Sequence, residues 1–357
     1  MSQTVVIAGA AGPLGRRVAA LAAADDAVTR VVAIGPGVSP FEMPPSIEAR
    51  PIGLDDPEVK ALLAEADVLV HLGSGEDHGP DGLPSTGSAS ADLAATRALL
   101  DAAAAVGVRQ VITLSSAMVY GAWGNNPVPL TEDAPLRPDP GLAYASAKAE
   151  SERLVFEWRA AQASPHDQTT PTVAVLRPAV SVSAESTEWL STSPWSAAAL
   201  RASGTDRPSQ FLHLDDLASA IDHARCEGLD GPFNVAPDGW TSADVLRDLA
   251  GPVGRLHLPA GISGRLASMR AEMGTTGPPE GWAYTRHSWV VANDRLQATG
   301  WHPRHSSEEA YVEADPGGPL ASMSPRRRQE LSLLAAVGVL VAAVGGITWV
   351  IRRRRRR

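Results

Sequence analysis

The feature of this sequence best suited to chemistry is a tyrosine and a lysine four residues apart, Tyr144 and Lys148, in the segment YASAK. In a helix this spacing places both side chains on one face. An ammonium beside a phenol stabilises the phenolate, which can then accept and return a proton near neutral pH. The whole chain has four tyrosines and two lysines, so a chance pair at this spacing is rare. A surface tyrosine beside a solvated lysine is the alternative interpretation.

A second chemical feature is the hydroxyl-rich segment TLSSAMVYG, residues 113–121, which follows a run of strand-forming residues. The carboxyl ends of parallel strands are where open α/β sheets bind ligands. There the Ser116 hydroxyl could donate a hydrogen bond to a substrate oxygen as negative charge develops on it. Taken alone, two serines at a strand end would indicate only a turn.

A third feature is the glycine-rich segment GAAGPLG, residues 9–15, which comes between a predicted strand and a predicted helix. Glycines in this context let the backbone turn tightly and approach a pyrophosphate, which sits at the amino end of the helix. A glycine-rich loop without a ligand is the alternative, but the strand–turn–helix context favours a dinucleotide. We therefore predict cofactor contacts from Gly9, Gly12 and Gly15.

Strand-like and helix-like segments alternate along the first half of the chain. Predicted strands cover 4–9, 30–34, 67–72, 110–114 and 172–176, and predicted helices cover 13–24, 57–66, 90–106 and 143–163. This alternation indicates an α/β fold of the Rossmann type, with a doubly wound parallel sheet. We assign 1–177 to the dinucleotide-binding domain, with 205–227 returning to it, and 178–312 mainly to a smaller substrate-binding lobe.

Taken in their order along the chain, the glycine segment, the serine segment and the Tyr144–Lys148 pair resemble the extended short-chain dehydrogenase/reductase family, also called the NAD-dependent epimerase/dehydratase family. Its glycine signature, its Ser-Ser-x-x-Val-Tyr-Gly block and its Tyr-x-x-x-Lys pair all have counterparts here. Further matches are LRP at 176–178, FLHLDD at 211–216, FNV at 233–235 and the block 293–303. The resemblance covers roughly residues 4–312.

The resemblance implies an enzyme that uses NAD or NADP, and it implies a role for each matching residue. Tyr144 would be the general acid–base, Lys148 would stabilise its phenolate and hold the nicotinamide ribose, and Ser116 would orient the substrate oxygen. It also extends the cofactor contacts to Leu14 and Leu54. No metal site is expected.

The sequence departs from the family pattern at three positions. Gly35 stands where NAD-binding members usually carry an acidic residue for the ribose. Gly53 stands at the usual adenine-binding aspartate, which Asp55 could replace only with a shift in register. Asp92 stands at a usual asparagine. These departures suggest unusual cofactor binding with an intact catalytic set.

The identity of the reaction stays open at this point. Ala117 and Met118 replace the acid pair of sugar 4,6-dehydratases, so dehydration is disfavoured. Alcohol or ketone redox and nucleotide-sugar epimerisation both remain, and an apolar C-terminal segment favours a lipophilic, sterol-like substrate. A membrane-anchored, non-catalytic NAD(P)-binding scaffold is the competing class.

That apolar segment is a run of 21 uncharged residues, 331–351, between arginine clusters at 326–328 and 352–357. Its length predicts a single transmembrane helix, preceded by a linker at 313–330 and followed by a basic tail. No export signal is visible, so we expect the catalytic domain on the cytoplasmic side, although the arginine-rich tail favours the cytoplasm as well. A single transmembrane helix cannot place both the catalytic domain and the tail in the cytoplasm, and we give more weight to the position of the catalytic domain.

The remaining composition limits the possible partners. The chain carries a net charge of −9, and nine of its 31 basic residues lie at or after Arg326, so the remaining body is strongly acidic and argues against nucleic-acid binding. A small-molecule substrate is expected instead. Small residues spaced by four in the apolar segment, such as Gly338 and Ala342, could support a homodimer. Cys226 is the only cysteine, so the chain can form no internal disulfide.

Overall fold

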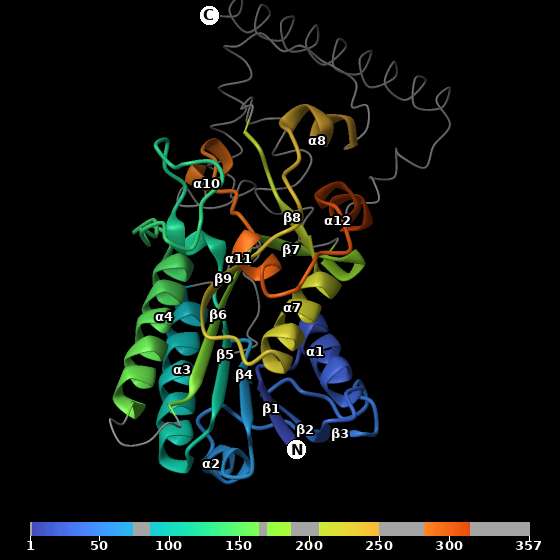
Figure 1. Ribbon diagram of the computed structural model, residues 1–357, viewed down its shortest axis with the longest axis vertical. Helices are drawn as coiled ribbons and strands as arrows, with labels where there is room; N and C mark the ends of the chain where they lie inside the picture. The colour runs from blue at the N-terminus through green and yellow to red at the C-terminus, as the bar shows by residue number, and fades with distance from the viewer. Residues whose placement is uncertain (1, 74–85, 164–169, 187–206, 250–281, 315–357) are drawn as a thin grey trace, which may run out of the picture.

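A computed structural model of the protein describes residues 2–73, 86–163, 170–186, 207–249 and 282–314. At its centre lies a seven-stranded parallel sheet with the order β3-β2-β1-β4-β5-β6-β9 (Figure 1). The strands are β1 (Gln3–Ala8), β2 (Val28–Ile34), β3 (Ile47–Arg50), β4 (Val68–His71), β5 (Gln110–Leu114), β6 (Thr172–Pro178) and β9 (Gly231–Val235). The strand order reverses between β1 and β4, so the sheet is doubly wound, as predicted.

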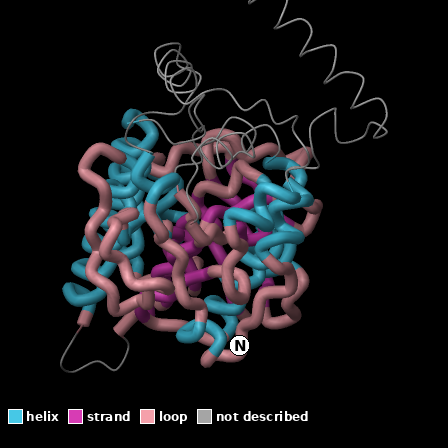
Figure 2. The backbone as a smooth tube through the Cα atoms, turned by 90° about the horizontal axis from the view of Figure 1, so that it is seen from above, coloured by secondary structure: helices cyan, strands magenta, loops and turns pink. Residues whose placement is uncertain are grey.

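Helices cover both faces of this sheet (Figures 1 and 2). One face carries α1 (Pro13–Ala23) packed against α7 (Leu214–Cys226). The other carries α2 (Pro57–Leu63), α3 (Thr86–Val106) and α4 (Ala143–Gln162), with α3 packed against its two neighbours. α7, from the second half of the chain, thus covers the same face of the sheet as α1 (Figure 1).

The apolar sequence of β1 explains why the sheet lies between two helical layers. Val5 and Ile7 belong to one hydrophobic cluster, whereas Val6 and Ala8 belong to another on the opposite face. All four side chains are fully buried. Parallel strands covered on both faces read as continuous apolar runs because neither side of the strand meets water.

The predicted elements of the first half are confirmed to within a few residues at their ends. The helix α3 begins earlier than predicted, at Thr86, and β3 was not predicted at all. β3 has only four residues and only Ile47 is buried in it, so its sequence carries little of the apolar signal of an inner strand.

The second half contributes β9 to the main sheet and also builds smaller elements. β7 (Val180–Val182) pairs in parallel with β8 (Phe211–His213). The described residues of this half also form the helices α8 (Ala243–Leu249), α10 (Trp282–Arg286), α11 (Asp294–Gln297) and α12 (Ser307–Ala314). α12 packs on β8, α11 packs on β9, and α12 continues two residues into the segment predicted as linker. The domain division at 177 and 178 stays a prediction.

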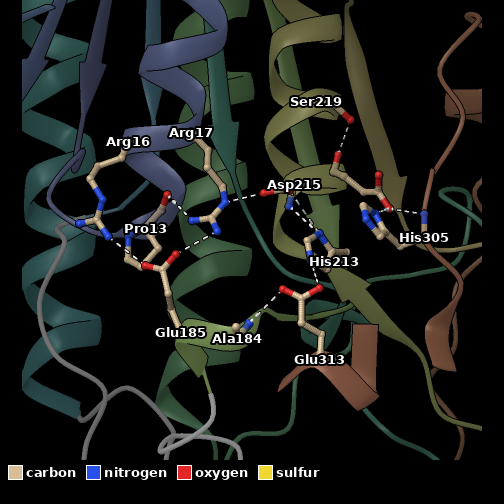
Figure 3. A network of polar contacts seen from close by, with 11 residues as sticks. Pro13, Arg16, Arg17, Ala184, Glu185, His213, Asp215, Ser219, His305 and Glu313 are labelled. Atoms are coloured by element: carbon tan, nitrogen blue, oxygen red, sulfur yellow. Dashed lines mark hydrogen bonds and ion pairs between the residues drawn. The ribbon is translucent and has the colours of Figure 1, made fainter. Parts of the chain in front are cut away.

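A polar network joins the glycine-loop helix to the second half of the chain (Figure 3). The Arg17 guanidinium contacts Asp215 at 2.5 Å and Glu185 at 2.9 Å, which links α1 to α7 and to the turn after β7. His213 then contacts Glu313 of α12 at 3.0 Å. These contacts fix the amino end of α1 relative to the elements that follow β6.

The predicted transmembrane helix, 331–351, lies outside the described residues. Within the described ranges, no helix is both long enough and apolar enough to cross a membrane.

Candidate active site

The glycine loop after β1 meets two different requirements. Gly9 has φ +79°, and a Cβ placed on it would lie 2.0 Å from the carbonyl oxygen of Gly73. A Cβ on Gly15 would lie 2.3 Å from the carbonyl oxygen of Ala10. Gly12, in contrast, is the N-cap of α1, and a Cβ there would meet no atom within 4 Å. Packing therefore requires the outer two glycines, whereas the middle one borders open space at the helix terminus.

This arrangement fits the pyrophosphate of a dinucleotide. The first N–H groups of a helix have no partner within the helix, so they attract an anion, as does the helix dipole. No acidic side chain lies in the first turn of α1 to oppose an anion. Leu14 packs partly buried against the core, and Leu54 is a core residue of the opposite face. Their contributions to cofactor binding stay predictions.

Gly35 and Gly53, which stand where the family usually has carboxylates, lie in different surroundings. Gly35 directly follows β2 and lies against the glycine loop, since a Cβ on it would be 3.6 Å from the Gly9 Cα and from the Ala10 nitrogen. At the other position, the Asp55 Oδ1 atom lies 2.8 Å from the place of a Cβ on Gly53. The Asp55 carboxylate thus lies next to the position of residue 53, and its part in binding the adenine stays a prediction.

The two serines after β5 are distinguished by their contacts. The Ser115 hydroxyl donates a hydrogen bond to the buried carboxylate of Glu152. Ser116 caps the short 3-10 helix η1 (Ala117–Tyr120), and its Oγ accepts a hydrogen bond from the Met118 N–H at 3.2 Å. An accepting hydroxyl still has its own proton to donate. Ser116 therefore keeps its hydroxyl proton for another acceptor, whereas Ser115 does not; the role of Ser116 toward a substrate oxygen stays a prediction.

Tyr144 and Lys148 lie in the first two turns of α4, which packs against η1. The Lys148 Nζ atom is 5.8 Å from the centre of the Tyr144 ring. It donates hydrogen bonds to Asp92 Oδ2 at 2.7 Å and to the carbonyl oxygen of Leu114 at 3.2 Å. The predicted pair therefore shares one face of the helix, and the structure adds Asp92 as a third member.

The charge of Lys148 is set by its surroundings. Its side chain is 8% exposed, and that of Asp92 is 11% exposed. Burial by itself lowers the pKa of Lys148, but the Asp92 carboxylate and Tyr144 outweigh this effect and raise the pKa above its ordinary value. Lys148 is thus held as an ammonium in a site that would otherwise disfavour its charge.

A second buried ion pair lies one turn further along α4. Arg177, from β6, contacts Glu152 through both Nε (3.0 Å to Oε1) and Nη2 (2.6 Å to Oε2). Its Nη1 also donates to the Tyr120 hydroxyl at 2.7 Å, and that hydroxyl donates to Asn234 Oδ1 at 2.8 Å. This network joins α4, β6, η1 and β9.

His71, at the end of β4, lies next to the Asp92–Lys148 pair. Its Nε2 atom is 2.9 Å from the Thr96 hydroxyl, and its ring is buried. Burial lowers the pKa of His71 to about 4, and Lys148 adds to the effect while Asp92 opposes it. The imidazole is therefore neutral at physiological pH.

A small cavity of about 10 Å³ lies beyond the carboxyl end of β6. Its lining includes Ala179, directly after β6, together with Trp289 and the segment 207–210. Arg207 is the charged residue in this lining; it is buried, and its Nη1 atom donates to Ser209 Oγ at 3.2 Å. Burial lowers the pKa of Arg207 to about 10. A buried guanidinium suits an anionic ligand.

The structure brings the predicted catalytic residues onto packed elements and adds several that the sequence analysis did not assign. Ser116 caps η1, and Tyr144 and Lys148 lie on α4. The residues not assigned a role from sequence are Asp92, His71, Glu152, Arg177 and Arg207. Asp92 had a sequence signal, its departure from the family asparagine, but that signal was interpreted as a loss.

Solved structures similar to this one include nucleotide-sugar epimerases. The UDP-N-acetylglucosamine 4-epimerase of Methanobrevibacter ruminantium M1, in complex with UDP-N-acetylmuramic acid, is 18% identical with a TM-score of 0.61, over 88% of this chain and 97% of that one. The UDP-glucose 4-epimerase of Thermus thermophilus, in complex with NAD, is 17% identical with a TM-score of 0.60, over 87% and 97%. At these identities the likeness establishes the fold.

Sequence comparison gives a curated relative and a family. An uncharacterized protein of Mycobacterium tuberculosis (strain ATCC 25618 / H37Rv) is 26% identical over 208 residues, 57% of this chain and 53% of that protein. The match thus spans about half the length of the relative. The NAD dependent epimerase/dehydratase family matches residues 5–236, which include the glycine loop, the serine turn and the Tyr144–Lys148 pair. The predicted nicotinamide cofactor agrees with this match, and the chain belongs to the NAD dependent epimerase/dehydratase family.

Proposed function

We propose that this protein is an NAD-dependent epimerase that oxidises and re-reduces a hydroxyl-bearing carbon of a nucleotide sugar. The observation that carries the proposal is the position of Gly73, at the end of β4. Its carbonyl oxygen meets the glycine loop at Gly9, and a Cβ on it would lie 3.7 Å from Lys148 Nζ. The cofactor loop and the acid–base pair therefore converge on one residue, as a reaction between cofactor and substrate requires.

In this proposal the chain's residues move one proton and hold two ligands. The Tyr144 phenolate accepts the proton of the substrate hydroxyl, and the Ser116 hydroxyl donates a hydrogen bond to the same oxygen. Among the described residues the Lys148 ammonium donates to two acceptors, so one of its three N–H groups is left for a ribose hydroxyl. The bound cofactor supplies the hydride acceptor and donor. Tyr144 returns the proton when the carbonyl is reduced.

A nucleotide sugar is supported as the substrate by two observations. The structural neighbours include UDP-sugar 4-epimerases with UDP-sugars bound. In this chain the buried Arg207 lines the small cavity beyond β6, and its positive charge would attract a phosphate group that approached this end of the sheet. The neighbouring Trp289 offers an apolar wall of the same cavity.

The test is a titration followed by a substrate panel, both on the full chain. NAD⁺ and NADP⁺ are titrated separately, because Gly35 provides no carboxylate to select NAD. UDP-glucose, UDP-galactose and UDP-N-acetylglucosamine are then compared with sterols and other hydrophobic alcohols. Interconversion of UDP-sugars with retained cofactor would support the proposal. Turnover of only the hydrophobic alcohols would replace it with lipophilic redox, and absence of cofactor binding would favour the non-catalytic scaffold.

Membrane attachment is a separate proposal that rests on the apolar segment 331–351. We expect the full chain to remain in the membrane fraction after an alkaline wash and a chain ending at residue 330 to be released. The predicted cytoplasmic side is tested by protease treatment of sealed vesicles. Protection of the catalytic body inside inverted vesicles would contradict it.

A further inference from the structure

The inference concerns the carboxylate of Asp92, which the family match leaves without a role. Asp92 lies on α3, in the residues that follow its first turn, and it reaches across to α4. Its Oδ2 atom is 2.7 Å from Lys148 Nζ, and both side chains are nearly enclosed. A Cβ on Gly73 would be 3.2 Å from Asp92 Oδ1, so the ion pair also faces the backbone that borders the glycine loop.

The position of the ammonium depends on this contact. A lysine side chain has a flexible four-carbon stem and three N–H donors of variable direction. It therefore needs fixed acceptors to hold its ammonium in one position. The described acceptors of Lys148 are Asp92 Oδ2 and the carbonyl oxygen of Leu114. Only the carboxylate among them carries charge. Removal of that charge would leave an enclosed ammonium held by one neutral carbonyl.

The other titratable groups around Lys148 cannot take over this task. On α4, Tyr144 and Glu152 act on Lys148 through space, and Glu152 is already engaged with Arg177 and Ser115. On β4, the neutral ring of His71 faces the pair. β5 contributes a backbone carbonyl. Asp92 is thus the described carboxylate in direct contact with the ammonium.

We propose that Asp92 is a positioning residue that holds Lys148 in its cationic form and directs it toward Tyr144 and the cofactor ribose. This inference rests on the proposed function, since it gives Asp92 a task within the same acid–base set. In the absence of the carboxylate, Lys148 would lose its proton at a lower pH, and the alkaline limit of catalysis would move down with it.

The test uses the fact that the chain has two lysines, Lys60 and Lys148. The full chain is labelled with lysine carrying ¹³C at the ε carbon, which gives two signals, and Lys60→Arg assigns them. The signals are followed with pH in the unchanged chain and in Asp92→Asn, which keeps the side-chain shape. We expect the Lys148 midpoint to fall by about one pH unit or more in Asp92→Asn, while the exposed Lys60 signal stays the same.

An unchanged Lys148 midpoint in Asp92→Asn would overturn the inference. If that variant does not fold, the unchanged chain still decides: the Lys148 midpoint should lie above that of an ordinary lysine, and a midpoint below the ordinary value would overturn the inference as well. With an active substrate, the alkaline limb of kcat/KM should move down by about one pH unit in Asp92→Asn. The lysine signals need no substrate, so failure of the proposed function and failure of this inference are separate results.

Discussion

Two buried ion pairs lie one turn apart on α4, and they differ in how fully they are enclosed by protein. Glu152 receives two guanidinium nitrogens of Arg177 and the hydroxyl of Ser115. Lys148 meets one carboxylate oxygen of Asp92 and one backbone carbonyl. The first pair connects four elements of the fold, whereas the second faces the glycine loop and Tyr144.

The difference separates an ion pair that joins elements of the fold from one that, in the proposed function, belongs to the reacting set on the same helix. A bidentate guanidinium pair with every partner in place gives geometric rigidity, and it has little left to offer a ligand. An ammonium with a remaining N–H can bind a ligand and influence a neighbouring phenol. Variants of the two tyrosines, one beside each pair, test this division most directly.

Tyr144→Phe should give the largest effect, a fall in turnover of about 10²–10⁴-fold with the fold retained, because it removes the general acid–base. The matched variant is Tyr120→Phe, which removes a hydroxyl from the Arg177 network. That change should lower the free energy of unfolding by about 1–3 kcal/mol and leave turnover largely intact. Steady-state kinetics and urea unfolding measure the two effects; the reverse pattern would reject the division.

Arg177→Met should lower the free energy of unfolding by about 3–5 kcal/mol, because it leaves the Glu152 carboxylate buried without its cation. Its side chain and that of Glu152 are 5% and 2% exposed, so water cannot replace the contact. Arg153→Met removes exposed ion pairs of the same helix and should change the stability far less. If chemical unfolding showed that both variants lose the same free energy of unfolding, burial of the Arg177–Glu152 pair would not make it more important for stability than an exposed pair.

A pH-dependent loss of stability is expected from His71, which adjoins the functional pair. Its pKa of about 4 in the folded protein lies below the unfolded value of about 6.5, so the unfolded chain binds more protons between these values. The stability contribution is complete above about pH 6.5 and is lost as the pH falls toward 4, by on the order of 3 kcal/mol. The free energy of unfolding of His71→Gln should change less with pH over this range than that of the unchanged chain. Parallel pH dependences of the two proteins would exclude His71 as the cause.

The smallest effect is expected at the glycine loop. Gly12→Ala should keep the stability of the chain, because its Cβ meets no atom within 4 Å, but it should weaken NAD⁺ binding by about tenfold, since the methyl enters the space assigned to the pyrophosphate. Gly9→Ala is the contrasting variant, because its Cβ would lie 2.0 Å from a carbonyl oxygen and φ is +79°. It should destabilise the fold. Calorimetric titration measures the NAD⁺ affinity of each variant, and thermal unfolding measures its stability. Unchanged NAD⁺ affinity in Gly12→Ala would mean that the pyrophosphate does not bind at this loop.

Much of this organisation could be predicted from local patterns. The glycine loop, the apolar strands and the i, i+4 spacing of Tyr144 and Lys148 each involve only a few neighbouring residues. They can therefore be recognised in the sequence alone. β3 escaped prediction because a four-residue strand with one buried side chain carries almost no pattern. Asp92 was recognised as a departure, but its partner lies 56 residues away, and no periodicity connects α3 to α4.

By itself, the sequence determined the doubly wound sheet, the family and the residue types available for proton transfer, because backbone geometry and apolar burial impose short repeats on the chain. The tertiary structure alone decided which charges meet. It paired Lys148 with Asp92 and Arg177 with Glu152, and it brought Gly73 between the glycine loop and the ammonium. The physical reason is that an ion pair is specified by distance and burial in space, and both depend on how the helices pack on the sheet.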